Sequence, residues 1–172
     1  MVIVLLSFLA MAQDQKVAVF EPAGDAITSV KDIVRELISS TIVNTDGYTV
    51  LERQLINKVL EEHHLQIGGL VDDAQIIEMG KLMGANLAFV STVSPLGDNF
   101  FVSGKLIDVQ TARIEKQRTA QTLRGSSDLL SVVQTMGREM FGGEPLSTDG
   151  RQNTERVITG SEDYALLHIY RP

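Results

Sequence analysis

The chain has 172 residues and a mass of 18.8 kDa, which suits one compact domain with a tail and is too short for two full-sized domains. Hydrophobic residues make up 44% and charged residues 22%, a composition typical of a folded globular protein. The formal net charge of -7 opposes binding to phosphates, so we expect no nucleic-acid partner. The lack of cysteine excludes disulfides, cysteine-ligated metal centres, thiol nucleophiles and a lipid-acceptor cysteine from this sequence.

Residues 1–12 have the pattern of an export signal. The apolar run at residues 2–10 has the length of a signal-peptide core, and small side chains stand at the two positions that a signal peptidase reads before Gln13. The run is shorter than the roughly 20 apolar residues of a membrane-spanning helix. Basic residues do not precede it, because Lys16 is the first positive side chain. We expect an exported protein, and two alternatives stay open: an upstream translation start, or a buried first strand.

Strand and helix patterns alternate through the first half of the chain. Residues 16–20 are β-branched and aromatic and run into a Glu-Pro-Ala-Gly turn, which predicts a strand. From Ile27 to Ile42, apolar side chains recur every three or four residues, which predicts a helix with one buried stripe that includes Ile33. Residues 48–51 predict a second strand.

Two further helices follow that second strand. The first is indicated by the apolar positions Leu55, Val59 and Leu60. The next begins at Asp72 or Asp73, whose carboxylate can accept backbone N–H groups, and it ends near Gly84. We expect this third helix to bury Ile76, Ile77, Leu82 and Met83.

The apolar period then changes to that of strands. Residues 86–94 and 99–109 are β-rich and flank a Pro-Leu-Gly-Asp connection, which predicts an antiparallel hairpin. Residues 113–123 are more polar and charged, as in an exposed edge strand. A last helix, capped by Ser126, Ser127 or Asp128, presents the apolar face Leu129, Leu130, Val132, Val133, Met136 and Met140. The order predicts an α/β domain over residues 13–141, a mixed sheet of about five strands with helices packed on it.

Residues 142–163 are rich in Gly, Pro, Ser, Thr and charge without periodicity, which indicates a polar linker. Residues 164–172 then contain the strand-like run Tyr-Ala-Leu-Leu-His-Ile-Tyr. This run either returns to an edge of the first sheet or begins a second, truncated domain, and the second interpretation is slightly favoured.

The sequence offers little for catalysis. Glu61 and His64 have the i, i+3 spacing of two-metal carboxylate sites, but such a site needs two copies of the motif and this chain has one. Neither a phosphate-binding glycine loop nor a Gly-x-Ser-x-Gly nucleophile turn occurs. We therefore expect no enzyme activity, no catalytic or metal-ligating residue and no cofactor.

The middle of the chain resembles the CsgG family, the curli production and transport component, whose relatives include lipoprotein activators of penicillin-binding proteins. The resemblance spans residue 16 to about residue 141. The matching motifs are Lys16-Val-Ala-Val-Phe-Glu-Pro, Leu51-Glu52-Arg53, Gly69-Leu70-Val71-Asp72, Gly84-Ala85-Asn86 and Leu106-Ile107-Asp108-Val109-Gln110-Thr111.

The resemblance implies a location in the periplasm or at the outer membrane. Pore-forming members carry membrane-spanning hairpins at the position of residues 95–99 and after the strand that ends near Leu123. Here four or five residues occupy the first position, and Arg124-Gly125 leads directly into a helix at the second. A spanning hairpin needs about two strands of 9 to 11 residues. We therefore expect a chain without its own transmembrane hairpins, peripheral to the outer membrane.

These features predict a non-enzymatic module that acts in secretion or envelope assembly through contacts with envelope or secretion proteins. The alternatives are a regulator of peptidoglycan synthesis and, less favoured, a ring-forming homo-oligomeric scaffold or a small-ligand or metal-dependent enzyme. The candidate interaction surfaces lie on the polar strand and on the second helix, at Arg53, Lys58, Glu61, Arg113 and Arg118.

Overall fold

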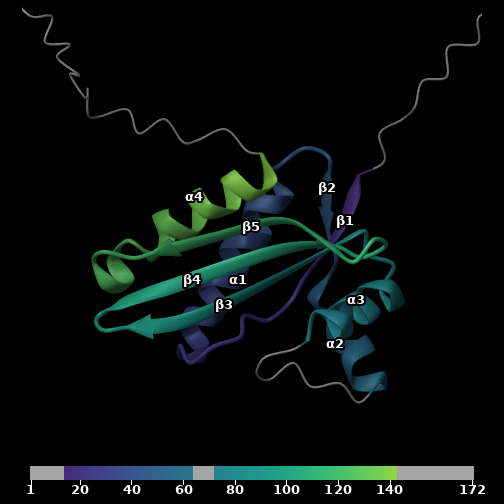
Figure 1. Cartoon of the computed structure of the whole chain (residues 1–172), viewed down its shortest axis with the longest axis horizontal. Helices are drawn as coiled ribbons and strands as arrows, with labels where there is room; N and C mark the ends of the chain where they lie inside the picture. The colour runs from purple at the N-terminus through teal and green to yellow at the C-terminus, as the bar shows by residue number, and fades with distance from the viewer. Residues whose placement is uncertain (1–13, 64–71, 143–172) are drawn as a thin grey trace, which may run out of the picture.

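The computed structural model describes residues 14–63 and 72–142 (Figure 1). Five strands form one sheet in the order β2-β1-β3-β4-β5, and four α-helices pack on it, so the predicted mixed α/β sheet is confirmed. The elements are β1 (Gln15–Val19), α1 (Thr28–Val43), β2 (Tyr48–Val50), α2 (Arg53–Glu62), α3 (Asp73–Leu82), β3 (Leu87–Leu96), β4 (Asn99–Asp108), β5 (Arg113–Gln121), the short 3-10 turn Gly125–Ser127 and α4 (Leu129–Phe141).

One half of the sheet is parallel. β1 pairs with β2 on one side and with β3 on the other, and both pairings are parallel. A parallel connection needs a crossover, and helices supply both crossovers: α1 joins β1 to β2, while α2 and α3 join β2 to β3. β1 is therefore an interior strand, and its residues Val17 and Ala18 are fully buried.

The other half is antiparallel. β3 and β4 are paired along ten residues each, from Leu87 opposite Asp108 to Leu96 opposite Asn99, which leaves only Gly97 and Asp98 in the turn. β5 pairs with β4, with one register shift near Leu106, and it forms the edge of the sheet. The predicted hairpin and edge strand are both confirmed.

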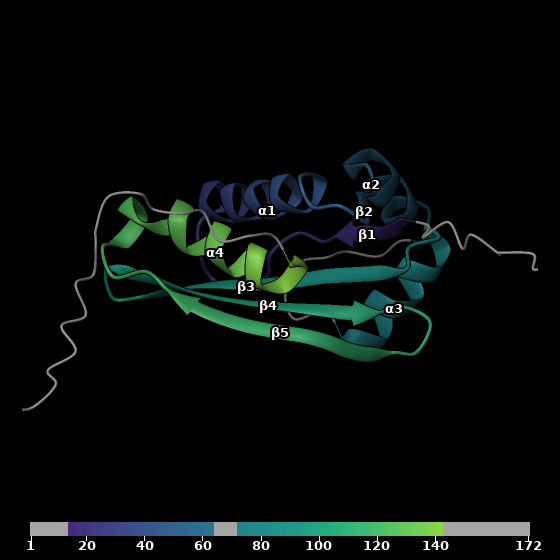
Figure 2. The ribbon, with the colours of Figure 1, turned by 90° about the horizontal axis from the view of Figure 1, so that it is seen from above.

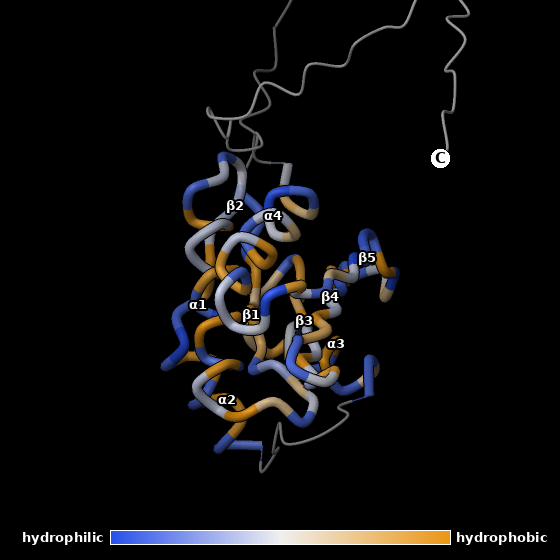
Figure 3. The backbone as a smooth tube through the Cα atoms, turned by 90° about the vertical axis from the view of Figure 1, so that its left-hand side faces the viewer, coloured by the Kyte–Doolittle hydropathy of each residue, from blue (hydrophilic) through white to orange (hydrophobic). Residues whose placement is uncertain are grey.

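The two faces of the sheet bury separate hydrophobic clusters. α1 and α4 cover one face, where Val17 and Val19 of β1 point. α2 and α3 pack on the other face, where Ala18 and Phe20 point. Figure 2 shows α1 and α4 together above the long β3, β4 and β5 strands, and Figure 3 shows apolar positions along β1, β3 and α1 against mostly hydrophilic ones along β5.

The buried stripe of three helices is narrower than predicted. In α1 the buried residues are Val30, Val34, Ile38 and Ile42, a row with strict four-residue spacing, and Ile33 is 48% exposed because it lies one helical step off that row. Leu82 in α3 and Leu130 in α4 are likewise 48% and 54% exposed. The predictions that these three side chains are buried were wrong.

The predicted helix starts are correct for α3 and only partly correct for α4. Asp72 precedes α3, and its Oδ1 accepts the backbone N–H of Ala74 at 3.5 Å. Asp128 precedes α4, but its carboxylate accepts the backbone N–H groups of Leu123 and Arg124, at 2.9 and 3.2 Å, and so closes the preceding turn instead of capping the helix.

The expected export signal and the final strand-like run lie outside the described residues, as does the expected linker apart from Gly142. Within residues 14–63 and 72–142, the structure contains no helix with the length and apolar character needed to cross a membrane.

Candidate functional site

A cluster of charged side chains lies where β1 and β2 end. Glu21 follows β1 by two residues, and Arg53 begins α2 three residues after β2. Because β1 and β2 are parallel neighbours, their carboxyl ends lie side by side at the same end of the sheet. Arg35 reaches the same point from α1. The fold therefore brings together residues from three elements.

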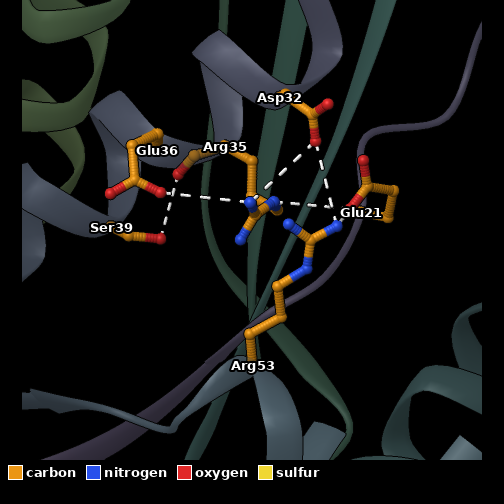
Figure 4. Close-up of polar contacts among 6 residues, drawn as sticks. All are labelled: Glu21, Asp32, Arg35, Glu36, Ser39 and Arg53. Atoms are coloured by element: carbon orange, nitrogen blue, oxygen red, sulfur yellow. Dashed lines mark hydrogen bonds and ion pairs between the residues drawn. The ribbon is translucent and has the colours of Figure 1, made fainter. Parts of the chain in front are cut away.

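Two guanidinium groups share two carboxylate oxygens in this cluster (Figure 4). Glu21 Oε2 lies 3.4 Å from Arg35 Nε and 3.4 Å from Arg53 Nη2. Asp32 Oδ1 lies 4.0 Å from Arg35 Nη2 and 3.9 Å from Arg53 Nη2. A second carboxylate on α1, that of Glu36, lies 3.9 Å from Arg35. These separations are long for charge-assisted hydrogen bonds, which are about 2.7–2.9 Å.

The two arginines differ in burial. The Arg35 side chain is 11% exposed, and its buried Nε has no hydrogen-bond acceptor among the described residues, although Glu21 is near. The Arg53 side chain is 54% exposed and donates one hydrogen bond, to Glu21 Oε2. The Arg35 guanidinium is thus largely removed from solvent, whereas the Arg53 side chain is in contact with it.

These groups line a cleft of about 240 Å³. Its wall combines charge with aliphatic surface from β1 and α2. We call this feature the charged cleft, and it is lined by Val19, Glu21, Arg35, Arg53, Ile56, Asn57 and Leu60.

A second surface lies along β5, the edge strand on the other side of the sheet from β2. The backbone of β5 is paired with β4 on one side only, so its outer edge is open within the described structure. Beside it, β5 and α4 enclose a shallow groove of about 340 Å³, here called the edge groove, which is lined by Thr119, Ala120, Gln121, Ser131, Val132, Thr135, Met136 and Glu139.

β5 carries three basic residues and one acidic residue, although the whole chain is acidic. Two of the basic side chains contact α4: Lys116 Nζ donates to the Met140 carbonyl at 2.7 Å, and Arg118 Nε lies 3.5 Å from a Glu139 carboxylate oxygen. Arg113, at the start of the strand, is exposed. The edge of the sheet is therefore a positively charged strand in a negatively charged protein.

The structure separates the five predicted surface residues into two groups. Arg53 lies in the charged cleft, whereas Arg113 and Arg118 lie on β5 at the other edge of the sheet. Lys58 is 71% exposed and lies 3.9 Å from Glu62 on the same helix, and Glu61 is exposed. The candidate residues from the sequence did not include Glu21 or Arg35. Glu21 belongs to the motif at residues 16–22 but had no role assigned to it, and none of the quoted motifs contains Arg35.

The described residues contain no cluster of metal-ligating side chains. Among the described residues, no three His, Asp or Glu side chains gather in a way that could hold an ion, and His64 lies outside those residues. The two aspartates with a lowered pKa, Asp108 and Asp128, lie in turns outside the charged cleft. The backbone N–H of Thr111 lowers the pKa of Asp108, and the backbone N–H of Leu123 lowers the pKa of Asp128.

Solved structures of other proteins have a similar fold. The LpoB C-terminal domain from Salmonella enterica has 15% identity and a TM-score of 0.55, over 64% of this chain and 83% of that domain. Lipoprotein GNA1162 from Neisseria meningitidis has 14% identity and a TM-score of 0.54, over 76% of this chain and 98% of that protein. At these identities the likeness concerns the fold.

Sequence comparison gives the family. No curated protein sequence matches the chain significantly. The profile of the family described as curli production assembly/transport component CsgG matches residues 9–105, more than half of the chain, and this span includes the charged-cleft residues and ends before β5. The chain belongs to the CsgG family.

Proposed function

We propose that this chain is an exported, non-enzymatic module that acts in the periplasm or at the outer membrane, in secretion or envelope assembly, by binding other proteins along the open edge of β5. The observation that carries the proposal is the single-sided pairing of β5 beside the edge groove. An extended peptide can add to such an edge through main-chain hydrogen bonds, while side chains that enter a neighbouring pocket give specificity.

Charge selects the partner of this edge. Exposed basic residues on an edge strand discourage uncontrolled pairing between copies of the same strand, because like charges would face each other. The same residues attract a strand of opposite charge. The partner proposed here is therefore an extended acidic segment of an envelope protein, which Arg113 and Arg118 recognise at the rim.

Site-specific photocrosslinking tests this proposal. A photoreactive residue at Gln117, exposed in the middle of β5, should give a discrete crosslinked product in living cells, and Arg113→Glu with Arg118→Glu should abolish that product. The same probe at Lys58, exposed on α2, is the control position. Equal products at both positions, or a product that survives the charge reversal, would contradict the role of β5.

The alternative implied by the resemblance, a regulator of peptidoglycan synthesis, differs in the partner and not in the surface. If the crosslinked protein is a transpeptidase and the purified chain stimulates its activity, the alternative is correct. A ring-forming scaffold predicts that the crosslinked protein is a second copy of this chain, with oligomers detectable by light scattering.

A further inference from the structure

We propose that the charged cleft binds a carboxylate attached to a small apolar group, with Arg35 and Arg53 as the residues that hold it. The proposal goes beyond the function given above and does not depend on β5. The two surfaces lie at opposite edges of the sheet, so either can fail without the other.

One unused donor of Arg35 points to an anionic ligand. A guanidinium has five N–H donors and no acceptor. In the described residues, the buried Nε of Arg35 has no hydrogen-bond acceptor, although carboxylate oxygens of Glu21, Asp32 and Glu36 lie 3.4–4.0 Å from the guanidinium. A desolvated donor without an acceptor destabilises the folded protein. A carboxylate in the cleft would supply the missing acceptor.

Arg53 provides the second half of the binding group. Its half-exposed side chain lines the cleft, and its single hydrogen bond to Glu21 is 3.4 Å long. Figure 4 shows the Arg35 and Arg53 guanidinium groups approaching each other from α1 and α2. Among the lining residues, Glu21 is the one carboxylate beside the two arginines, and Asp32 and Glu36 lie 3.9–4.0 Å from the same guanidinium groups outside the lining. A ligand carboxylate must therefore take the place of an internal carboxylate. A carboxylate between the two guanidinium groups could accept paired hydrogen bonds from either fork.

The rest of the lining favours a monoanion with an apolar body over phosphate. Val19, Ile56 and Leu60 contribute aliphatic surface, and Asn57 contributes an amide. A dianion would be repelled twice as strongly by the Glu21 carboxylate. The volume of about 240 Å³ lies below the roughly 300–1,000 Å³ of drug-sized ligand sites. The ligand is therefore of the size of one amino-acid residue, either free or as part of a peptide.

Substitution of Glu21 should change the ligand affinity in the opposite direction to substitution of Arg53. Glu21 is the internal carboxylate that already occupies both arginines, so it competes with the carboxylate of a ligand. Loss of the Glu21 charge should strengthen binding, whereas loss of the Arg53 charge should weaken it. A cluster with a purely structural role would show no binding in any of these variants.

The test is an NMR titration of the isotopically labelled full chain with N-acetyl-leucine and with its amide, which lacks the negative charge. The acid should shift the Asn57 side-chain resonances, and the amide should not. Arg53→Gln should weaken binding of the acid about tenfold, as expected for a lost charged hydrogen bond. Glu21→Gln should tighten binding of the acid. Arg53→Lys should weaken it by less than Arg53→Gln does, because lysine keeps the positive charge but lacks the paired N–H donors of the guanidinium.

Lys58→Gln is the matched control, since it removes one positive charge from the same helix outside the cleft and should leave the affinity unchanged. Equal binding of acid and amide, or equal losses in Arg53→Gln and Lys58→Gln, would overturn the proposal.

A third probe distinguishes the sources of the carboxylate. A peptide amide with an internal Glu-Leu pair that binds more tightly than N-acetyl-leucine indicates a partner's side chain, and weaker binding indicates a terminal or free carboxylate.

Discussion

Gly104 in β4 leaves the space that the ring of Phe89 in β3 occupies. A Cβ at residue 104 would lie 2.9 Å from Phe89 Cζ and 3.3 Å from Met140 Sδ. Phe89 is fully buried, and its ring also packs on that of Phe141, with 5.9 Å between centroids. The sheet and α4 can therefore approach each other closely only because residue 104 has no side chain.

Gly104→Ala should lower the free energy of unfolding by about 1–3 kcal/mol, because the extra methyl group would lie 2.9 Å from the ring of the buried Phe89 and overpack the core. Urea denaturation followed by circular dichroism measures this change. Ser103→Ala, at the neighbouring half-buried position, should change the free energy by less than about 0.5 kcal/mol. Similar effects of the two substitutions would contradict the packing explanation.

Ala112→Gly should stabilise the protein by up to about 1 kcal/mol. Ala112 has φ of 58° in the turn before β5, a left-handed conformation that disfavours a Cβ by roughly 1–2 kcal/mol. Glycine removes that strain and returns part of the gain through the entropy of the unfolded chain. Ala120→Gly, within β5, relieves no such strain, adds entropy to the unfolded chain and removes a partly buried methyl group, so it should be destabilising. Thermal unfolding of both variants checks the opposite signs.

Stability should depend on the Asp108 carboxylate near and above pH 4. The backbone N–H of Thr111, 2.6 Å from Asp108 Oδ1, lowers the pKa of Asp108 below its usual value of 3.8. A group whose pKa is lowered by folding stabilises the protein above its unfolded pKa, and this contribution is lost as the pH falls through the folded pKa. Asp108→Asn should therefore be less stable than the wild type at pH 7 and approach it at pH 3.

Urea unfolding at both pH values tests the Asp108 prediction. Asp46→Asn, in the exposed turn before β2, removes the same charge and reports the general effect of net charge on stability. A stability difference between Asp108→Asn and the wild type that stays constant or grows toward pH 3 would be the contrary result.

Lys105 and Asp73 should show a modest, salt-sensitive coupling. Lys105 Nζ lies 2.6 and 2.8 Å from the two Asp73 carboxylate oxygens and connects β4 to α3, but both side chains are partly exposed. A double-mutant cycle with Lys105→Met and Asp73→Asn should give about 0.5–1 kcal/mol at low salt and less in 1 M salt. The cycle removes the separate effect of Asp73 on the α3 dipole. A coupling that does not respond to salt would argue against a Coulomb origin.

The sequence predicted the order of elements because period and turn chemistry are local properties. Residues 99–109 alternate as a strand, and the structure has β4 over Asn99–Asp108. Burial was less predictable, since it depends on which neighbour covers each side chain. Ile33 and Leu130 are apolar and fit the three- or four-residue spacing of their helices, yet both are about half exposed.

The charged cleft was largely invisible to sequence reasoning. Arg53 was predicted as a surface residue, and its partner Glu21 lies 32 positions earlier. Their contact depends on β1 and β2 being parallel neighbours, a tertiary fact that no local pattern encodes. Arg35 has a polar position on an amphipathic helix, where an arginine is expected to face solvent. Only the tertiary fold places it beside α2 residues in the cleft, where its side chain is 11% exposed.

The cleft also joins two helices that belong to different layers, because α1 packs on one face of the sheet and α2 on the other. Hydrophobic packing holds each layer to the sheet, whereas Coulomb attraction between Glu21, Asp32 and the two arginines spans the seam between them. The Debye length falls from about 10 Å in 0.1 M salt to about 3 Å in 1 M salt. Added salt should therefore weaken the pairs of the half-exposed Arg53 across this seam more than those of the nearly buried Arg35.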